Sequence, residues 1–497
     1  MTPLPKVAKP AIDDGKADWM NSLTPTADSG GKRQRNDPGS PPPAISRREM
    51  LGALSAPLLL AAARNSHELS LATFRVDITC PIDHPLLARR QGIATEIADP
   101  LYVHGIVLLG SGDPIAIVAV DWCEIRNAAY DRWRDLLAEA ARSSPERILL
   151  CCVHQHDAPL ADLGAEHLLA EVGMAGETLD TDFFEQTGQR IADGLRESLP
   201  GARRVTHLGL GRAKVEKIAS NRRVVLSDGT VTFRRGSNGA IDRLNQEADE
   251  GLIDPWLRTI SFWDNDTPLA ALNAYAVHPM SYYGTGEVSA DFVGIARDRR
   301  LRDDPSVHQM YLSGCSGDVT AGKYNDASRA NRAVLADRLY AAMAAAWQAT
   351  ERIPLEQVSF RSTELELEFR KDPEYTAEAM RRVLEDEQAG RKERVLAAMG
   401  LSTLGRLRDG HKIDFPCLDL GAAQIVLFPG ESFVGYQLLA QQLRPDSFVM
   451  SIGYGQCWTG YLPTEYAFDD GFDGHWVWVA PGAEARIEHA LRKVLQV

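Results

Sequence analysis

Residues 149–159 read Leu-Leu-Cys-Cys-Val-His-Gln-His-Asp-Ala-Pro, an apolar run that ends abruptly in polar residues and a proline. The run is short and lies between Pro145 and Pro159, which favours a buried β-strand over a helix. Side chains two positions apart at a strand end point the same way, so His154 and His156 are predicted to address one site. Open α/β sheets bind ligands outside the carboxyl ends of their strands, where this pair would lie. Taken alone, the pair is also compatible with two histidines that only pack in the core.

An apolar strand followed by a candidate metal ligand recurs further along the chain. His278 directly follows the apolar run 269–277, and Glu431 follows the run 425–428 after Pro-Gly. Tyr461 lies beyond a further strand. Each residue has an ordinary alternative, since Glu431 would suit a helix N-terminus and Tyr461 would suit a packed aromatic position. Together they favour one site, because a partly buried carboxylate needs a partner and unrelated residues need not share one rim of a sheet.

The hydrophobic periodicity predicts an α/β (α+β) fold in which mixed β-sheets are flanked by helices. The expected strands cover residues 72–78, 103–109, 115–120, 149–153, 205–210, 224–226, 231–233, 257–263, 269–277, 309–312, 358–369, 425–428 and 447–452. The expected helices cover residues 127–142, 182–199, 290–300, 327–350, 374–404, 433–443 and 483–495. Because residues 374–404 are highly charged, we expect them to form a solvated excursion with the capacity to cover a site. No internal repeat of fixed period is visible in the sequence.

Residues 1–64 are predicted to be a disordered leader followed by a twin-arginine signal peptide. The first 45 residues are rich in Pro, Gly, Asp and Lys and have almost no apolar periodicity. Arg47 and Arg48 then precede a short uncharged apolar run that ends at Ala63, which is the pattern of twin-arginine export signals. The run is too short to span a membrane comfortably, so we expect no transmembrane anchor in the mature protein. The alternative is a chance Arg-Arg pair before a buried helix. If residues 1–64 are the leader and signal peptide, residues 65–497 are a single mature domain that is periplasmic or secreted.

Charge and cysteine content exclude some classes of protein. The formal net charge of -14 argues against nucleic acid or an anionic membrane as a partner, since both reward Lys and Arg. The 7 cysteines are scattered and include no CxxC pair, so neither a disulfide scaffold nor a zinc finger is predicted. Cys151 and Cys152 are adjacent in a predicted strand, so they should face opposite sides of a sheet as core residues.

Several short motifs follow one another along the chain after residue 70. They are Arg75-Val76-Asp77-Ile78-Thr79, His154-Gln155-His156-Asp157-Ala158-Pro159, Asn221-Arg222, Ala276-Val277-His278-Pro279, Gly317-Asp318-Val319, Pro429-Gly430-Glu431 and Gly460-Tyr461-Leu462-Pro463-Thr464. In this order the set resembles the catalytic domain of the neutral ceramidase family, which are zinc-dependent amidases. The resemblance implies a neutral-ceramidase-like fold for residues 65–497 and a zinc ion (Zn2+) held by His154, His278, Glu431 and Tyr461. It also implies that His156 and Arg222 contact the substrate or handle protons, so the candidate catalytic residues are His156, Arg222 and Tyr461.

The sequence departs from the family pattern in three places. Asp157-Ala158 stands where the family has Ser-Gly, which would put a negative charge beside the metal. Phe472 stands where the family has a second tyrosine that assists the substrate carbonyl, unless Tyr466 takes that role. The chain also ends at Val497, which leaves no room for the family's C-terminal immunoglobulin-like domain. The metal site is still expected despite these differences, whereas ceramide is not expected to be the substrate.

The sequence therefore predicts an exported zinc-dependent hydrolase that cleaves an amide bond in a small-molecule or lipid-like substrate. The metal would lower the pKa of a water molecule and polarise the carbonyl. His156 would carry a proton to the leaving group, and Arg222 would hold a carbonyl or an anion. One alternative is an ester or lactone hydrolase on the same metal site, and another is a non-catalytic secreted metal-containing binding protein. A serine hydrolase using Ser316 is disfavoured because the sequence there lacks the G-x-S-x-G elbow. The oligomeric state is not predicted.

Overall fold

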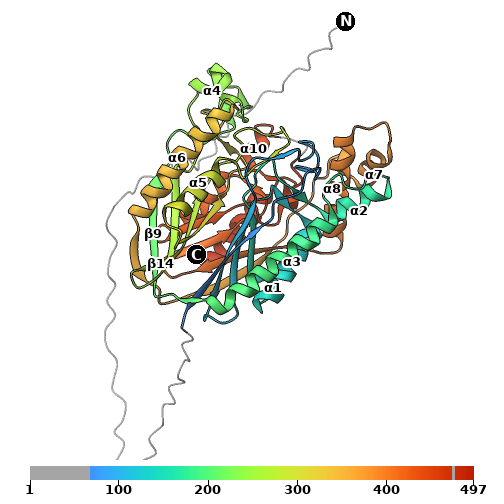
Figure 1. Cartoon of the computed structure of the whole chain (residues 1–497). Coiled ribbons are helices and arrows are strands. Elements are labelled where there is room, and N and C mark those ends of the chain that lie inside the picture. Colours follow the sequence, from blue (N-terminus) through green and yellow to red (C-terminus); the bar gives the residue numbers. More distant parts are fainter. Residues whose placement is uncertain (1–67, 473–475) are drawn as a thin grey trace, which may run out of the picture. The chain divides into compact units, whose positions relative to one another are not determined.

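The computed structural model describes residues 68–472 and 476–497 (Figure 1). The expected leader and twin-arginine signal of residues 1–64 lie outside the described residues. No helix among the residues that the structure describes is long and apolar enough to cross a membrane.

Three larger sheets carry the fold. The first, in the order β6-β4-β3-β1-β8, contains β1 (Ser70–Asp77), β3 (Tyr102–Leu109), β4 (Ile115–Val120), β6 (Ile148–Cys152) and β8 (Arg203–Arg204). The second, in the order β16-β14-β13-β9-β18, contains β9 (His207–Lys214), β13 (Trp256–Asp264), β14 (Thr267–Tyr275), β16 (His308–Ser313) and β18 (Glu351–Pro354). The third, in the order β19-β20-β21-β23, contains β19 (Ser359–Leu365), β20 (Ile413–Asp419), β21 (Ala423–Leu427) and β23 (Phe448–Ile452).

The remaining strands form short pairs around these sheets. They are β2 (Glu96–Ile97) with β15 (Glu287–Val288), β5 (Glu124–Ile125) with β7 (Leu160–Ala161), β10 (Ser220–Asn221) with β17 (Val319–Thr320), β11 (Arg223–Val225) with β12 (Val231–Phe233), and β22 (Glu431–Ser432) with β24 (Tyr461–Leu462). The helices are α1 (Asn127–Ala141), α2 (Leu163–Glu171), α3 (Thr181–Ser198), α4 (Arg243–Glu247), α5 (Asp291–Asp303), α6 (Arg329–Gln348), α7 (Ala377–Glu385), α8 (Arg391–Arg408), α9 (Val434–Leu443), α10 (Glu465–Asp469) and α11 (Ala483–Leu495). The predicted mixed α/β class is thereby confirmed.

Each larger sheet contains the same local arrangement. An antiparallel hairpin, β3–β4, β13–β14 or β20–β21, is followed by a helix, α1, α5 or α9, and then by an edge strand parallel to the hairpin's second strand. A parallel return requires such a crossover connection. The carboxyl ends of the two paired strands therefore lie at one edge of each sheet, so each sheet has a place where following loops can meet.

The three sheets pack around a common core. Ile117 of β4, Leu272 of β14 and Ile425 of β21 all belong to one cluster of buried apolar side chains. Cys151 belongs to this cluster and Cys152 to another on the opposite face of the first sheet, as the sequence predicted. Because both faces of β4 are covered, all its residues are buried, which explains its unbroken apolar sequence.

Helices cover the outer faces of the sheets, as Figure 1 shows for α1 and α3 alongside the first sheet and for α5 and α6 alongside the second. Several begin at residues that favour helix initiation. The Asp180 side chain accepts a hydrogen bond from the Phe183 amide at the start of α3, and Ser328 does the same for Asn331 at the start of α6. These caps satisfy amides that the first turn leaves unpaired.

The expectation for residues 374–404 is wrong in one respect. They form two helices, α7 and α8, that pack as an amphipathic pair on α2 rather than standing in solvent. Met380, Leu384 and Met399 are buried in the cluster that covers the outer face of the third sheet. The charges occupy only one side of each helix, so a high charge content did not imply full exposure.

Strand β20 is absent from the predicted strands, and it contains Pro416 in its middle, although proline is rare inside sheets. The structure resolves this conflict through register. Pairing of β20 with β21 covers only Cys417 to Asp419, so Pro416 lies where that ladder has already ended.

Candidate metal centre

Three side chains from the segments that follow β6, β14 and β21 converge on one point, and the third of them, Glu431, begins β22. The Nε2 atoms of His154 and His278 are 3.1 Å apart. One carboxylate oxygen of Glu431, Oε2, lies 3.4 Å from Nε2 of His154 and 3.1 Å from Nε2 of His278. All three residues are buried. The structure thus brings together His154, His278 and Glu431, the three residues that the sequence analysis selected because each follows a predicted strand.

Backbone carbonyls orient both imidazoles. Nδ1 of His154 lies 2.8 Å from the carbonyl oxygen of Cys123, and Nδ1 of His278 lies 2.8 Å from that of Ser316. A carbonyl only accepts, so each Nδ1 carries the proton and each Nε2 presents a lone pair. The ring of Tyr454 stacks on His154 with centroids 4.3 Å apart and fixes its plane.

This arrangement fits a metal ion. Two imidazole lone pairs and a carboxylate oxygen face one another, and Oε2 of Glu431 is buried without a hydrogen-bond donor among the described residues. Such a concentration of acceptors is unfavourable unless a cation lies between them. Tetrahedral ligands about 2.1 Å from zinc lie about 3.4 Å from one another, which agrees with the observed separations of 3.1–3.4 Å.

The electrostatics of the site also suit a cation. Burial lowers the pKa of His278 to about 4, with the positive charge of Arg222 adding to the effect, so this imidazole is neutral. Burial likewise holds the pKa of His156 well below its ordinary value. Burial would raise the pKa of Glu431, but the two neighbouring histidines outweigh it and keep that pKa well below its usual range. Burial would lower the pKa of His154, but the neighbouring Glu431 carboxylate outweighs it and raises that pKa above its ordinary value. Metal ligation needs neutral imidazoles and an ionised carboxylate, so a metal ion would take the place of the second proton that Glu431 favours on His154.

Close backbone contacts fix the position of Glu431. Its amide donates to the carbonyl of Gly460 at 2.8 Å, and Glu431 pairs with Tyr461 across the parallel strands β22 and β24. Gly430 has a φ of +46°, and a Cβ there would lie 2.0 Å from Oγ1 of Thr459. A Cβ on Gly317 would lie 2.1 Å from the carbonyl oxygen of Glu431. Glycine is required at both positions because the chain segments are in direct contact.

The two histidines of the first motif do share one site, but not by strand alternation. Strand β6 ends at Cys152, and His154 has a φ of +75° in the left-handed region. The rings of His154 and His156 lie 5.2 Å apart in an edge-on arrangement. Positive φ at a residue other than glycine is strained and is concentrated at functional sites. The loop after the strand, and not the pleat of the strand, therefore aims both rings.

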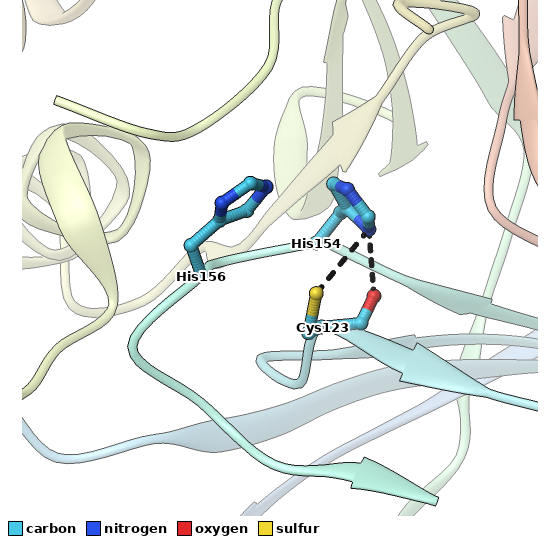
Figure 2. A group of neighbouring side chains, drawn as sticks. All are labelled: Cys123, His154 and His156. Carbon is cyan, nitrogen blue, oxygen red and sulfur yellow. Dashed lines mark hydrogen bonds between the residues drawn. The ribbon is translucent and has the colours of Figure 1, made fainter. Parts of the chain in front are cut away.

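A second cluster of potential ligands comprises Cys123, His154 and His156 (Figure 2). The thiol of Cys123 lies 3.6 Å from Nδ1 of His154, beside the carbonyl that accepts from the same nitrogen. Burial keeps the pKa of this thiol well above its usual value, so it stays protonated, whereas a metal ligand must be a thiolate. The set of His154, His278 and Glu431 is therefore the better candidate.

Tyr461 and Arg222 stand beside this centre. Nη2 of Arg222 donates to the Tyr461 hydroxyl at 3.2 Å, and Nε of Arg222 donates to the Gly317 carbonyl at 3.2 Å. The ring of Tyr461 lies nearly parallel to that of His278, with centroids 6.3 Å apart. Burial raises the pKa of the Tyr461 hydroxyl, so ionisation of this phenol requires a nearby cation.

A cavity of about 150 Å3 opens onto the centre. It brings together the predicted residues His154, His156, Arg222, Glu431 and Tyr461 with residues that the sequence did not indicate, which are Leu87, Arg90, Gln91, Met280, Tyr283 and Trp476. Tyr283 could have been noticed as an aromatic shortly after His278. Arg90 and Trp476 carried no recognisable signal, because only the fold brings their loops to the cavity.

The motif residues Asn221 and Asp318 form hydrogen bonds that hold the segments around the site together. Nδ2 of Asn221 donates to Asp318 at 2.8 Å, and the other Asp318 oxygen accepts from the Val434 amide at the start of α9, also at 2.8 Å. Burial raises the pKa of Asp318 to about 6. These bonds join the segment that bears Arg222 to the segment that bears Glu431, so both residues have structural roles. The Arg75–Thr79 motif is likewise structural, with the Arg75 guanidinium 3.5 Å above the Tyr102 ring.

The residues at which the sequence departs from the family pattern do not line the cavity. Asp157 accepts a hydrogen bond from the Gly284 amide at 2.8 Å and is not among the residues that line the cavity. Phe472 packs edge-on against Tyr461, with ring centroids 5.4 Å apart, and Tyr466 lies under the guanidinium of Arg223. Ser316 is buried and its hydroxyl contacts that of Tyr454 at 2.7 Å, which gives no support to a serine nucleophile.

Comparison with known proteins gives a likeness in structure. The fold resembles that of neutral ceramidase from Pseudomonas aeruginosa with a TM-score of 0.62, at 15% identity, over 86% of this chain and 75% of that one. It also resembles a ceramidase complexed with C2, with a TM-score of 0.60, at 16% identity, over 86% of this chain and 76% of that one. No protein-family model matches the chain, and no curated protein matches its sequence. The chain therefore has a ceramidase-like fold.

Proposed function

We propose that this protein is a zinc-dependent hydrolase that cleaves an amide bond in a small-molecule or lipid-like substrate. The observation that carries the proposal is the convergence of His154, His278 and Glu431, whose lone pairs face one another within 3.4 Å. The ceramidase-like fold supports an amidase, because the solved structures that it resembles are ceramidases.

His154, His278 and Glu431 would hold the zinc ion, with the phenol of Tyr461 as a fourth ligand. When bound, zinc supplies a Lewis acid that lowers the pKa of water and polarises a carbonyl group. Glu431 and Tyr461 are fixed relative to one another by their pairing across β22 and β24, so the two oxygen ligands would need little rearrangement.

His156 is positioned to move protons. It lines the cavity, its ring lies 5.4 Å from that of His278, and its Nδ1 is buried without a hydrogen-bond partner among the described residues. Because burial keeps this imidazole neutral, it can accept a proton from the attacking water and pass it to the departing nitrogen.

Arg222 and Tyr283 supply donors for the substrate carbonyl. Arg222 is anchored by its bonds to Gly317 and Tyr461, which leaves Nη1 available to the cavity. Tyr283 also lines the cavity and packs edge-on against His156, with ring centroids 4.7 Å apart. Donors that are fixed before the reaction stabilise the negative charge that develops on oxygen, and Phe472 has no hydroxyl to contribute.

We further propose that the protein is exported through the twin-arginine route to the periplasm or beyond. The support is the pair Arg47 and Arg48 followed by an uncharged apolar run. Twin-arginine export carries folded proteins, which suits an enzyme that binds its metal before export.

The test of the function is a matched substrate panel with purified protein at known zinc content. A fatty acyl amide, the corresponding ester, a lactone and a long-chain ceramide would be compared, with His156→Ala as the inactive control. Amide hydrolysis that exceeds that of ceramide and is lost in the variant is expected. Cleavage of only the ester or lactone would show that the site catalyses ester or lactone hydrolysis instead of amide hydrolysis. If zinc-loaded protein cleaves no member of the panel, a non-catalytic binding protein is favoured.

A further inference from the structure

Two arginines, Arg90 and Arg222, face the cavity without a carboxylate partner among the described residues. The donors of Arg222 go to a carbonyl and a phenol hydroxyl. The guanidinium of Arg90 lies 4.7 Å from the centre of the Trp476 ring. Both side chains are half-buried, so each has lost part of its hydration without gaining an anionic partner.

Several other enclosed arginines in this protein pair with carboxylates, whereas the guanidinium of the buried Arg235 donates to backbone carbonyls. Arg297 lies 2.7 Å from Asp121, Arg134 lies 2.8 Å from Asp414, and Arg126 lies 3.5 Å from Glu124. The chain has an excess of acidic residues, with a formal net charge of -14. Carboxylates are therefore abundant in the chain. Two arginines in one cavity without a carboxylate partner indicate a binding site for an anionic ligand.

None of the residues that line the cavity offers a free carboxylate to Arg90. Glu431 is the acidic residue there, and its Oε2 faces the two histidines. Asp157, which the sequence placed near the metal as an added negative charge, is bonded to the Gly284 amide instead. The lining is therefore cationic before any metal is counted.

The setting of Arg90 is rigid. The indole NH of Trp476 donates to Glu124 at 3.1 Å, which fixes the ring against which the guanidinium lies. The preceding residues Leu87, Ala88 and Arg89 all have φ between +48° and +54°, and the Leu87 amide is held by the Ala158 carbonyl at 3.0 Å. Three successive residues in the left-handed region are costly, and such strain is retained where the position of a side chain matters.

We propose that Arg90 binds a carboxylate of the substrate, so that the substrate is an amide with a carboxylate group near the scissile bond, such as an N-acyl amino acid. Arg222 serves the scissile carbonyl, because its Nη2 lies at the Tyr461 hydroxyl beside the metal centre. Arg90 lies on the Trp476 wall and serves the carboxylate, which its planar fork can bind with two hydrogen bonds. This assignment rests on the proposed amidase function and specifies its substrate class.

The test compares substrates that differ only in charge. The first pair differs on the amine side of the scissile amide, where N-octanoylglycine has a carboxylate and N-octanoylglycinamide has a neutral amide. The second pair differs on the acyl side, where N-octylsuccinamic acid has the carboxylate and N-octylsuccinamide has the neutral amide. Release of the products by zinc-loaded protein is expected to show kcat/KM about 10- to 100-fold higher for the charged member of one pair. The pair that shows the preference identifies the side of the amide on which the carboxylate lies.

Arg90→Met is expected to abolish that preference, and Arg90→Lys to retain part of it because it keeps the charge but not the fork. Arg89→Met is the matched control, since Arg89 is adjacent on the same loop but pairs with Glu177 instead of lining the cavity. A binding measurement on His156→Ala protein provides a readout without turnover. There, N-octanoylglycine or N-octylsuccinamic acid, whichever is preferred, should bind about 10- to 100-fold more weakly after Arg90→Met is added.

Two failures are distinguishable. Equal cleavage of both members of each pair, unchanged by Arg90→Met, would overturn the carboxylate site and leave the amidase standing. Absence of cleavage of all four amides by zinc-loaded protein would overturn the amidase itself. A preference for the charged substrate that persists in Arg90→Met would reassign the carboxylate to another residue and also overturn the inference.

Discussion

The Nε2 atoms of His154 and His278 lie 3.1 Å apart although the residues are separated by 124 positions in the sequence. Each Nδ1 faces a backbone carbonyl, so the two Nε2 lone pairs face one another and Glu431 completes the set. Two acceptors at this distance repel unless a cation joins them. Their close approach therefore makes the metal centre the feature on which function is expected to depend.

Substitution of a ligand should remove the metal. His278→Ala is expected to lower the zinc content from about one ion per chain to a small fraction, because it removes one of the two imidazole ligands. Elemental analysis after gel filtration measures this. His156→Ala is the matched control, expected to keep its zinc while kcat falls about 100- to 10,000-fold, as for loss of a general acid–base group. Full zinc content in His278→Ala would refute the proposed site.

The Tyr283 hydroxyl is expected to assist the substrate carbonyl. Tyr283→Phe should lower kcat by about 100-fold without changing zinc content, since it removes one hydrogen-bond donor and keeps the ring that packs on His156. Tyr282→Phe is the control, because that ring lies against Arg332. If Tyr283→Phe is fully active while Phe472→Tyr increases ceramide hydrolysis, the second tyrosine position of the ceramidase family is residue 472, and Tyr283 has no catalytic role.

Asp157 should make stability depend on pH. Burial raises its pKa from 3.8 to about 6, so the folded state holds the proton more tightly than the unfolded state. The free energy of unfolding should therefore fall as pH rises through this interval, with a penalty of about 3 kcal/mol fully present above pH 6.

Asp157→Asn should remove that penalty and keep an oxygen that accepts from the Gly284 amide. Urea unfolding at matched zinc content should show the variant gaining stability over wild type between about pH 4 and pH 6 and keeping that advantage at higher pH. The exposed Asp113→Asn is the control. A constant difference between variant and wild type at all pH values would show that Asp157 has no raised pKa.

Export should depend on the paired arginines. Replacing Arg47 and Arg48 with lysine is expected to leave the precursor in the cytoplasm, because the twin-arginine route reads the arginine pair and not charge alone. Cell fractionation measures the distribution. Lysine at Arg33 and Arg35, which lie in the leader ahead of the pair, should have no effect. Unchanged periplasmic recovery of the first variant would rule out the route.

The sequence by itself determined the local part of this protein. Apolar runs with clear periodicity fixed most strands and helices, including β6 and β21, because burial of one face or both dictates such patterns. It also predicted that His154, His278 and Glu431 share one site, because residues that follow buried strands lie at a sheet edge, and the structure brings these three side chains together. Motif likeness to ceramidases anticipated the fold that structural comparison shows.

Only the tertiary structure decided what surrounds those residues. It placed Arg90, Tyr283 and Trp476 on the cavity, turned Asp157 toward Gly284, and packed α7 and α8 as part of the core. These outcomes depend on loop conformations and on contacts between segments far apart in the chain, which leave no periodic signal in the sequence. Hydrophobic pattern reports which face of an element is buried, whereas the direction of a loop side chain is set by whatever the fold packs against it.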